Sequence, residues 1–306
     1  MIRFVSPITQ KPLVAKDYKT LTCPESGELF YKIDGIWRML DPARAERFSQ
    51  FIEEYELIRQ AEGRKESDAG YSQLPFTPAE HPLATMWAER AASFQFLKDS
   101  VLPRGTASNL TVLDLGAGNG WLSNQLALMD HTVAAVDLTV NEFDGLGVHP
   151  HYSADFVPIQ AEFDQLPLGS EQFDVVIFNA SFHYSANYLP TLQEAMRVCK
   201  RNGRIIIMDT PIYQKSESGT DMVAEREASF KQKFGTRSNS LVSENFLTPH
   251  RLADLTQQLG LDADVLSRHP QWRLASRRLK RQLRGERPAA EFPLIILNQT
   301  GGTYAS

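Results

Sequence analysis

The chain has 306 residues, of which 42% are hydrophobic and 23% are charged, and its formal net charge at pH 7 is −5. This composition is typical of a globular protein that is long enough for one large domain and a smaller one. The negative net charge argues against a surface that coats nucleic acid.

Apolar runs and cysteines bear on the location of the protein. No apolar run approaches the roughly 18 residues that a membrane-spanning helix needs, and residues 1–7 lack the apolar core of a signal peptide. We therefore expect a cytoplasmic protein that does not enter a membrane. Cys23 and Cys199 lie far apart in the sequence, and in a cytosolic chain we expect both to be reduced, packed thiols.

Residues 1–40 contain two similar proline-containing turns, which begin at Ser6 and at Cys23. Two such turns separated by a short hairpin are how a zinc ribbon presents its four ligands, here at positions 6, 9, 23 and 26. Together with the stretch 30–40 (FYKIDGIWRML), the segment resembles the small zinc-ribbon-like domain that is found alone as a methyltransferase activator and fused to some methyltransferases.

The ligand positions of this segment depart from the ribbon pattern. Only Cys23 is a thiol, whereas Ser6, Thr9 and Ser26 are poor zinc ligands. We therefore expect the ribbon fold without the metal, and the alternative is an irregular N-terminal β-segment. The apolar residues expected to hold the ribbon together are Leu13, Leu21, Phe30, Ile33, Ile36 and Trp37.

Two helices are predicted before the first core strand. The first, Pro42–Ala61, has Asp41 as a plausible N-cap and a proline at its first position. Residues 65–82 are expected to form a loop, and residues 83–102 a second helix. Apolar side chains recur in the first helix at intervals of three and four residues. They are Phe48, Phe51, Ile52, Tyr55 and Ile58.

The stretch 112–120 (VLDLGAGNG) is the most informative motif of the chain. An apolar strand runs into Asp114 and then into glycines at 116, 118 and 120, which let the backbone turn sharply and approach a ligand closely. The loop leads into a predicted helix. A dinucleotide fingerprint would need Gly or Ala at the position of Trp121, so the motif argues against a hydride-transfer cofactor.

Further segments follow at characteristic distances. The strand 131–137 ends in Asp137, 23 residues beyond Asp114, where a carboxylate can accept hydrogen bonds from a ribose diol. The later segments are 156–168, which carries Glu162, the strand 173–179, and a fifth strand at 204–209 entered through a helix end and turn at Asn202-Gly203.

Together these motifs resemble those of class I S-adenosylmethionine-dependent methyltransferases, with the type 11 small-molecule enzymes nearest, over roughly residues 85–265. The resemblance implies an α/β, Rossmann-like fold whose seven-stranded sheet is mostly parallel and ends in an antiparallel strand. It also implies S-adenosylmethionine as the cofactor, which leaves as S-adenosylhomocysteine.

The resemblance further implies which residues bind this cofactor. The glycine loop would hold the methionine end, Asp137 the ribose, and Glu162 the adenine amino group, while the N–H of Phe163 would face a ring nitrogen. In this class the segment before the core often folds over the cofactor as a lid, so Arg59 and Tyr71 could also face the cofactor, and the alternative is that they are packing and surface residues. The remaining residues implied in binding are Asp114, Gly116, Ala117, Gly118, Asn119, Gly120, Leu138 and Asn179.

The predicted organisation has three parts. Residues 1–40 form the ribbon-like segment, residues 41–84 the helical lid, and residues 85–306 the methyltransferase domain. Within the last part, residues 210–247 are expected to cap the substrate pocket. A helix at 248–260 and strands at 261–266 and 292–298 are expected to complete the fold.

Residues 268–287 hold eight Lys or Arg residues against one Glu. As a helix, this segment would place Arg273, Arg277, Arg281 and Arg284 on one face. Such a face could meet phosphate, an acidic carrier protein or a membrane surface, and the alternative is a solvated helix.

Methyl transfer from a sulfonium is an in-line displacement whose main requirement is alignment, and a base is needed only where the nucleophile carries a proton. The loop 179–184 is the expected wall for this chemistry. It lacks both prolines of the [Asp/Asn]-Pro-Pro-[Tyr/Phe] motif, which argues against an exocyclic amine of a base as acceptor. His183 is the histidine that the loop would place near the methyl group, so it is the candidate catalytic base, with a packing role as the alternative.

The leading hypothesis is methyl transfer to a small-molecule acceptor at oxygen, carbon or nitrogen. One alternative is an RNA or protein methyltransferase that docks through residues 268–287. Another, suggested by the activator-like N-terminus, is a catalytically inactive, cofactor-binding activator of another subunit. No motif identifies the acceptor or the oligomeric state.

Overall fold

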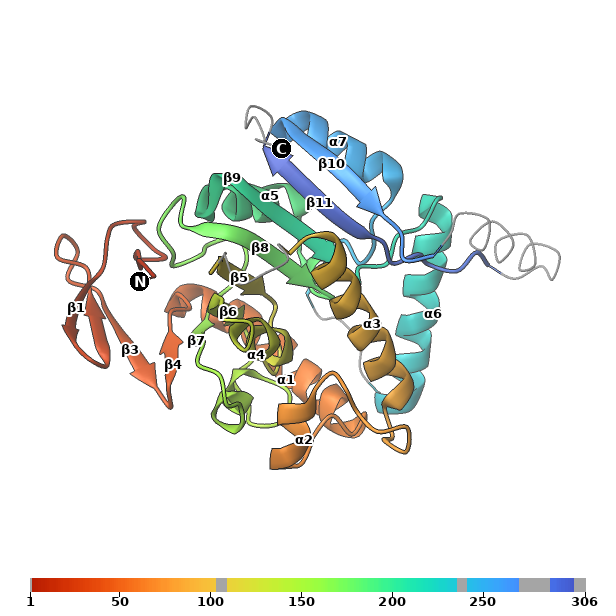
Figure 1. Cartoon of the computed structure of the whole chain (residues 1–306), viewed down its shortest axis with the longest axis horizontal. Helices are drawn as coiled ribbons and strands as arrows, with labels where there is room; N and C mark the ends of the chain where they lie inside the picture. Colours follow the sequence, from red (N-terminus) through yellow and green to blue (C-terminus); the bar gives the residue numbers. More distant parts are fainter. Residues whose placement is uncertain (1, 103–108, 236–240, 270–286, 300–306) are drawn as a thin grey trace.

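The computed structural model describes residues 2–102, 109–235, 241–269 and 287–299. Its centre is a sheet whose core has the strand order β7-β6-β5-β8-β9-β11-β10 (Figure 1). The first five of these strands run parallel, whereas β11 is antiparallel to both β9 and β10. The predicted Rossmann-like fold with an antiparallel closing strand is confirmed. The core strands are β5 (Thr111–Leu115), β6 (Thr132–Asp137), β7 (Val157–Gln160), β8 (Phe173–Asn179), β9 (Cys199–Met208), β10 (Leu261–Leu266) and β11 (Leu294–Gln299).

Four strands of the N-terminal segment extend this sheet, so that the described residues form an eleven-stranded sheet. The strand β4 pairs in parallel with β7, where Trp37 lies opposite Ile159. This pairing satisfies backbone groups that β7 would otherwise leave open at the edge of the sheet. The N-terminal segment is therefore continuous with the core sheet. Its strands, which form successive antiparallel pairs, are β1 (Val14–Asp17), β2 (Thr20–Thr22), β3 (Leu29–Ile33) and β4 (Ile36–Arg38).

Helices cover both faces of the core sheet, and its central strands β5, β6 and β8 are largely buried, as is usual for a parallel sheet. The strand β10 at the edge of the sheet is mostly exposed. Neighbouring residues of β5 alternate between two apolar clusters. Leu113 belongs to the cluster that includes residues of α5 (Tyr188–Val198) and α7 (Pro249–Leu259). Val112 belongs to the cluster that includes residues of α3 (Ala84–Ser100) and α4 (Trp121–Ala127).

The helix boundaries follow from their caps. The predicted helix Pro42–Ala61 is confirmed as α1, and the Asp41 carboxylate accepts from the Ala43 N–H at 2.9 Å. The helix α7 likewise begins after Thr248, whose hydroxyl accepts from the Arg251 N–H at 3.1 Å. It ends at Gly260, which adopts the left-handed conformation that favours glycine.

Two details of the predicted elements are wrong. Within the expected loop 65–82, Ser67 caps a short helix, α2 (Asp68–Gln73), by accepting from the Gly70 N–H at 3.1 Å. The structure also contains two 3₁₀ turns that the sequence analysis does not predict, η1 (Leu146–His151) and η2 (Phe182–Tyr184). The predicted cap insertion contains a long helix, α6 (Ser216–Phe234).

The expected turn at Asn202-Gly203 is the second error. The helix α5 ends at Val198, and β9 starts at the next residue and includes both of these positions. A Cβ at Gly203 would lie 2.6 Å from the Cys199 Sγ, so the glycine permits close packing inside the strand. The sequence pattern predicts a turn at this glycine, whereas the structure shows that close approach of the backbone to Cys199 is the reason for a glycine here.

The two proline-containing turns of the N-terminal segment lie near each other. The Cys23 thiol is buried. Hydrogen bonds from Ser26 and, to a smaller extent, from Thr9 lower the pKa of this thiol. The Ser6 hydroxyl instead accepts from the Thr9 N–H at 3.1 Å. Among the residues that the structure describes, no group of three or more His, Cys, Asp or Glu side chains could hold a metal ion. The ribbon-like fold without zinc stays a prediction.

Residues 270–286 lie outside the described part of the chain. The predicted basic face of Arg273, Arg277, Arg281 and Arg284 falls on these residues and stays a prediction. Within the described ranges, no helix combines the length and the apolar character needed to cross a membrane.

The continuity of the N-terminal strands with the core leads to a stability prediction. Phe30 is buried in the main apolar cluster, whereas its neighbour Tyr31 points to the other face of β3 and is 48% exposed. Phe30→Ala should lower the free energy of unfolding of the whole protein by about 3–5 kcal/mol. Tyr31→Ala is the matched control and should change it by less than about 0.5 kcal/mol.

Urea denaturation followed by tryptophan fluorescence measures both variants. If Phe30→Ala left the main transition unchanged, the N-terminal strands would not fold as one unit with the core.

Candidate active site

The glycine loop lies at the carboxyl edge of the parallel strands, where open α/β sheets bind their ligands. It connects β5 to α4, and the N–H groups of Gly116 and Ala117 donate to the Val136 carbonyl at 2.8 and 3.1 Å. Gly116, Gly118 and Gly120 all have positive φ angles, of 74°, 57° and 83°. A Cβ at Gly116 would overlap Ser181, so both the conformation and the close packing of this loop require glycine.

Asp137 connects the glycine loop to the end of the neighbouring strand β6. One carboxylate oxygen accepts from the Gly118 N–H at 2.8 Å, and the other accepts from the Thr139 N–H and hydroxyl at 2.8 and 2.7 Å. Desolvation raises the pKa of Asp137 although these hydrogen bonds oppose the change. A carboxylate has about four acceptor positions, so Asp137 retains capacity for a ligand hydroxyl.

A cavity of about 120 Å³, here called the glycine-loop cavity, lies against this loop. The helix α1 covers it with Phe48, Phe51 and Tyr55. The structure thus brings together much of the predicted cofactor set with part of the predicted lid. The predicted cofactor residues on its walls are Gly116, Gly118, Asp137, Leu138, Glu162 and Phe163.

Glu162 is held by a residue that the sequence did not indicate. The guanidinium of Arg44, in the first turns of α1, binds both carboxylate oxygens, with 2.5 Å between Nη2 and Oε2. Desolvation raises the pKa of the buried Glu162 although Arg44 acts in the opposite direction. The two residues are 118 positions apart, so no spacing in the sequence could have paired them. This ion pair fastens α1 over the glycine-loop cavity.

Other predicted cofactor residues lie within or below the loop and not on the cavity walls. Asp114 is fully buried and accepts from the Ser123 hydroxyl at 2.8 Å, and burial raises its pKa to about 7. The Asn119 side chain accepts from the Trp121 N–H at 3.1 Å and thereby supports the start of α4. Ala117 and Gly120 are buried as well. These residues shape the loop, and a direct contact with a cofactor stays a prediction for them.

The two predicted lid residues outside α1's apolar stripe differ in position. The guanidinium carbon of Arg59 lies 4.5 Å from the centre of the Tyr55 ring. The Arg59 Nη2 is 3.4 Å from the hydroxyl of Tyr184, which is another residue of the cavity wall. Tyr71 does not line the cavity. Its hydroxyl donates to the Phe143 carbonyl at 2.8 Å, and its ring stacks on His151. A cofactor contact stays a prediction for both.

His183 follows the end of β8 but lies on the wall of neither cavity described here. Its ring is 4.5 Å from the Tyr184 ring, and its Nδ1 is enclosed without a hydrogen-bond partner in the described structure. Desolvation, followed by the charges of Arg90, Arg226 and Arg59, lowers the pKa of His183 to about 3. The imidazole is therefore neutral at pH 7 and a weak base, so the geometry does not favour the predicted catalytic role.

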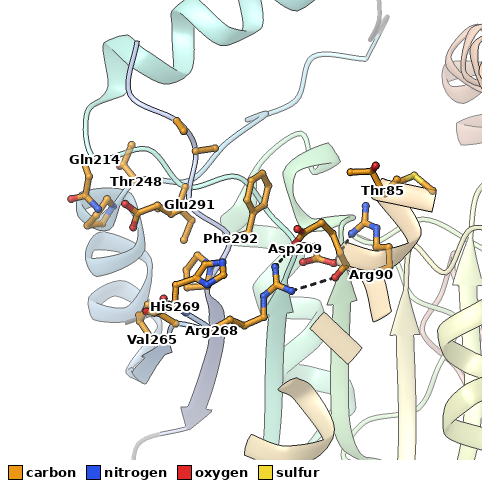
Figure 2. Close-up of a pocket in the computed structure, with 18 of the residues that line it drawn as sticks. Thr85, Arg90, Asp209, Gln214, Thr248, Val265, Arg268, His269, Glu291 and Phe292 are labelled. Atoms are coloured by element: carbon orange, nitrogen blue, oxygen red, sulfur yellow. Dashed lines mark hydrogen bonds and ion pairs between the residues drawn. The ribbon is translucent and has the colours of Figure 1, made fainter. Parts of the chain in front are cut away.

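A larger cavity of about 880 Å³, here called the β9 cavity, opens between α3, the end of β9 and the segment before β11 (Figure 2). Arg90 and Asp209 point toward each other on its wall, with 2.7 Å between Nη1 and Oδ2. Asp209 also accepts from the Ser93 hydroxyl at 2.6 Å. No motif predicted this cavity, because its walls come from separate segments of the chain, with Arg90 and Asp209 119 positions apart.

The two cavities are neighbours along the same edge of the sheet. Ala180, which lines the glycine-loop cavity, donates its N–H to the Met208 carbonyl at 2.9 Å, and Asp209 of the β9 cavity is the next residue. Ala180 and Asp209 both have a φ of 54°, a left-handed conformation that is uncommon outside glycine. Such strain is concentrated at functional sites, where the surrounding structure enforces it.

The fold and the glycine-loop site define a class I S-adenosylmethionine-dependent methyltransferase domain. In agreement, residues 113–207 match the family described as "Methyltransferase domain". The chain thus contains an enzyme domain of this class, whose cofactor is S-adenosylmethionine.

Two curated relatives each match part of the chain. One is the malonyl-[acyl-carrier protein] O-methyltransferase of Buchnera aphidicola, 31% identical over 101 residues, which are 33% of this chain and 40% of that protein. The other is an uncharacterized methyltransferase of Schizosaccharomyces pombe, 29% identical over 127 residues, which are 39% of this chain and 47% of that protein. The chain therefore matches less than half the length of either relative.

A solved structure supports the fold. Phosphoethanolamine N-methyltransferase 2 of Haemonchus contortus, in complex with S-adenosyl-L-methionine, aligns with a TM-score of 0.51 and 14% identity. The alignment covers 80% of this chain and 60% of that one.

The buried Asp114 leads to a prediction on pH dependence. Its pKa is raised in the folded state, so folding is weakened as the pH rises from about 4, where the unfolded group ionises, to about 7. Asp114→Asn removes this ionisation. The difference in unfolding free energy between variant and parent should therefore shift in favour of the variant across this window, by about 1.4 kcal/mol for each unit of the pKa shift.

Urea titrations at several pH values between 4.5 and 8 measure this difference. Ser123→Ala should enlarge the pH dependence, because it removes the hydrogen bond that favours the charged carboxylate. A difference that stayed constant with pH would contradict an ionising group at Asp114.

Proposed function

We propose that the protein transfers the methyl group of S-adenosylmethionine to a small-molecule acceptor. The observation that carries the proposal is the pair of adjoining cavities at the carboxyl edge of the sheet, one against the glycine loop and one against the end of β9. The second has the volume of a small-molecule pocket, which is typically about 300–1,000 Å³. One relative is named a malonyl-[acyl-carrier protein] O-methyltransferase, and the malonyl group in this name, although carried by a protein, is a small group that a cavity of this volume could hold.

The residues of the glycine-loop cavity fit the cofactor. Asp137 has unused acceptor capacity for a ribose hydroxyl, and Gly116 and Gly118 present backbone without a side chain on the cavity wall. Glu162 would accept from the adenine amino group, with the Phe163 N–H beside the ring. The bound cofactor supplies an activated methyl group, and the protein's task is to align the acceptor with it.

The helix α1 would act as a lid in this function. The glycine-loop cavity, at about 120 Å³, is smaller than a typical ligand pocket. Entry of the cofactor therefore requires movement of the side chains that α1 places over it. The Arg44–Glu162 ion pair is the contact that would be loosened or rearranged at this step.

Binding of S-adenosylhomocysteine, measured by isothermal titration calorimetry, tests the proposal. Asp137→Ala should weaken binding by about 10- to 100-fold, because a charged hydrogen bond contributes about 1.5–3 kcal/mol. Asp262→Ala, on the exposed face of β10, is the control and should bind like the parent.

Thermal unfolding checks that the Asp137→Ala protein is folded, since this side chain also supports the loop. Failure of the folded parent protein to bind S-adenosylhomocysteine would contradict the proposed function. Unchanged affinity in Asp137→Ala would contradict the ribose assignment.

A further inference from the structure

The N-terminal strands expose a group of large apolar side chains. Six of the thirteen exposed large apolar side chains in the described part of the chain lie within residues 8–33. Four of these belong to β1 and β3, which stand apart from the helices in Figure 1. Single exposed apolar residues are common, whereas a contiguous group marks an interaction surface. The four are Val14, Leu29, Tyr31 and Ile33, which are 41–49% exposed.

These four side chains share one face of the N-terminal sheet, here called the open face. The strand β3 contributes every second residue to it, from Leu29 to Ile33. Leu29 lies opposite Thr22 of β2, and Thr22 lies opposite Val14 of β1. Residues that lie directly opposite each other project from the same face of a sheet. The other face carries Phe30, which is buried in the main apolar cluster. The exposed group is therefore contiguous.

The edge of this sheet is protected against pairing with another strand, whereas the open face is not. The outermost strand, β1, has four residues and a bulge between Ala15 and Asp17. It also carries an exposed lysine, Lys16. Short length, bulges and lysines are the devices by which natural sheets block association through an edge. A partner is therefore expected on the face of the sheet and not at its edge.

One row of paired residues crosses the open face with a charge at each end. In the order β1 to β4, the row consists of Asp17, Thr20, Tyr31 and Arg38. Its ends are separated by three strand spacings of about 4.8 Å each. The row has one charge of each sign, so it has no net charge that would attract nucleic acid or an anionic membrane. A partner that matches it has an acidic group at one end and a basic group at the other.

Both charges of this row are available to a partner. Asp17 is exposed and accepts from the Lys19 N–H at 2.8 Å. Arg38 is partly exposed and donates from Nη1 to the Gln160 side-chain oxygen at 3.3 Å. Both of these contacts are with uncharged groups. A carboxylate has about four acceptor positions and a guanidinium has five donors, so each side chain retains capacity for an ion pair.

We propose that two copies of the chain associate through their open faces, related by a twofold axis that runs parallel to the strands between β2 and β3. This rotation reverses the order of the strands across the interface. Asp17 of each copy then lies opposite Arg38 of the other, and two ion pairs form. In the middle of the row, Tyr31 of one copy packs on Thr20 of the other. Such an interface uses the same surface on both copies, as is usual in protein dimers.

The row of charges selects this arrangement over the other twofold packing of two sheet faces. An axis perpendicular to the strands would keep the strand order, so that Asp17 would lie opposite Asp17 and Arg38 opposite Arg38. Like charges that oppose each other across an interface cost several kcal/mol. The parallel axis replaces both repulsions with attractions, so the open face is complementary to itself in one orientation.

The expected dimer is a weak one. The strands β1 to β4 have three to five residues each, and about half of these project from the open face. A standard interface uses roughly 20–30 residues a side, so we expect a dissociation constant in about the micromolar range. Association stabilises the folded state, so the comparison of Phe30→Ala with Tyr31→Ala in urea applies at concentrations at which the chain is monomeric.

Sedimentation velocity of the full chain over a concentration series tests the proposal. The parent should pass from monomer to dimer as its concentration rises through the micromolar range. Tyr31→Asp, which places a charge at the centre of the interface, should weaken association at least about tenfold. Leu128→Asp is the matched control, since Leu128 is 53% exposed and follows α4, and it should associate like the parent.

Two charge reversals test the orientation. Asp17→Lys and Arg38→Glu each place like charges opposite one another, so each variant alone should associate at least about tenfold more weakly than the parent. An equimolar mixture of the two variants should form a heterodimer about as tightly as the parent forms its dimer. In the mixture every charge again meets its opposite. Thermal unfolding checks that both variants are folded.

Each outcome supports or overturns the dimer. A parent that stays monomeric throughout the series would overturn the proposal, and so would a dimer that Tyr31→Asp leaves intact. A mixture of folded Asp17→Lys and Arg38→Glu that fails to associate would overturn the parallel axis. None of these results bears on the proposed function, which is tested separately by the binding of S-adenosylhomocysteine.

Discussion

The site depends on one partly buried carboxylate, that of Asp137. It accepts from Gly118 in the loop after β5 and from Thr139 in the loop after β6, and so fixes two neighbouring strand ends relative to each other. Three residues of the loop are glycines with positive φ angles, and glycine has more conformational freedom in an unfolded chain than any other residue. The carboxylate restricts that freedom while it keeps acceptor capacity directed at the glycine-loop cavity. Loop geometry and proposed ribose recognition therefore rest on the same side chain.

A second constraint comes from elements outside the core fold. The helix α1 follows directly from β4, which is itself paired to β7, so the N-terminal strands fix the point from which the lid begins. The Arg44–Glu162 ion pair then fastens the first turns of α1 to the segment after β7. The sheet extension and the lid thus form one continuous path from the N-terminus to the cofactor cavity. This path gives the N-terminal segment a structural role in positioning the lid.

The sequence predicted the parts of the site that are local in the chain. Each of these parts depends on residues a few positions apart, so its pattern can be recognised in the sequence. They are the glycines at 116–120, the carboxylates Asp114 and Asp137 at strand ends, and the caps of α1 and α7. The parts that were missed depend on tertiary contact. Arg44 meets Glu162 across 118 positions, and the parallel pairing of β4 with β7 has no sequence signature. The depressed pKa of His183 arises from burial and from arginines on three different helices, which no spacing along the chain reveals.

The central claim is that the glycine loop and α1 form one cofactor site. Hydrogen–deuterium exchange with and without S-adenosylhomocysteine tests it most directly, because exchange reports the opening of each backbone segment. The account predicts that the cofactor product slows exchange together in the loop 116–120, in the Asp137–Thr139 turn and along the helix α1. Binding that protected the loop but left α1 unchanged would contradict the account.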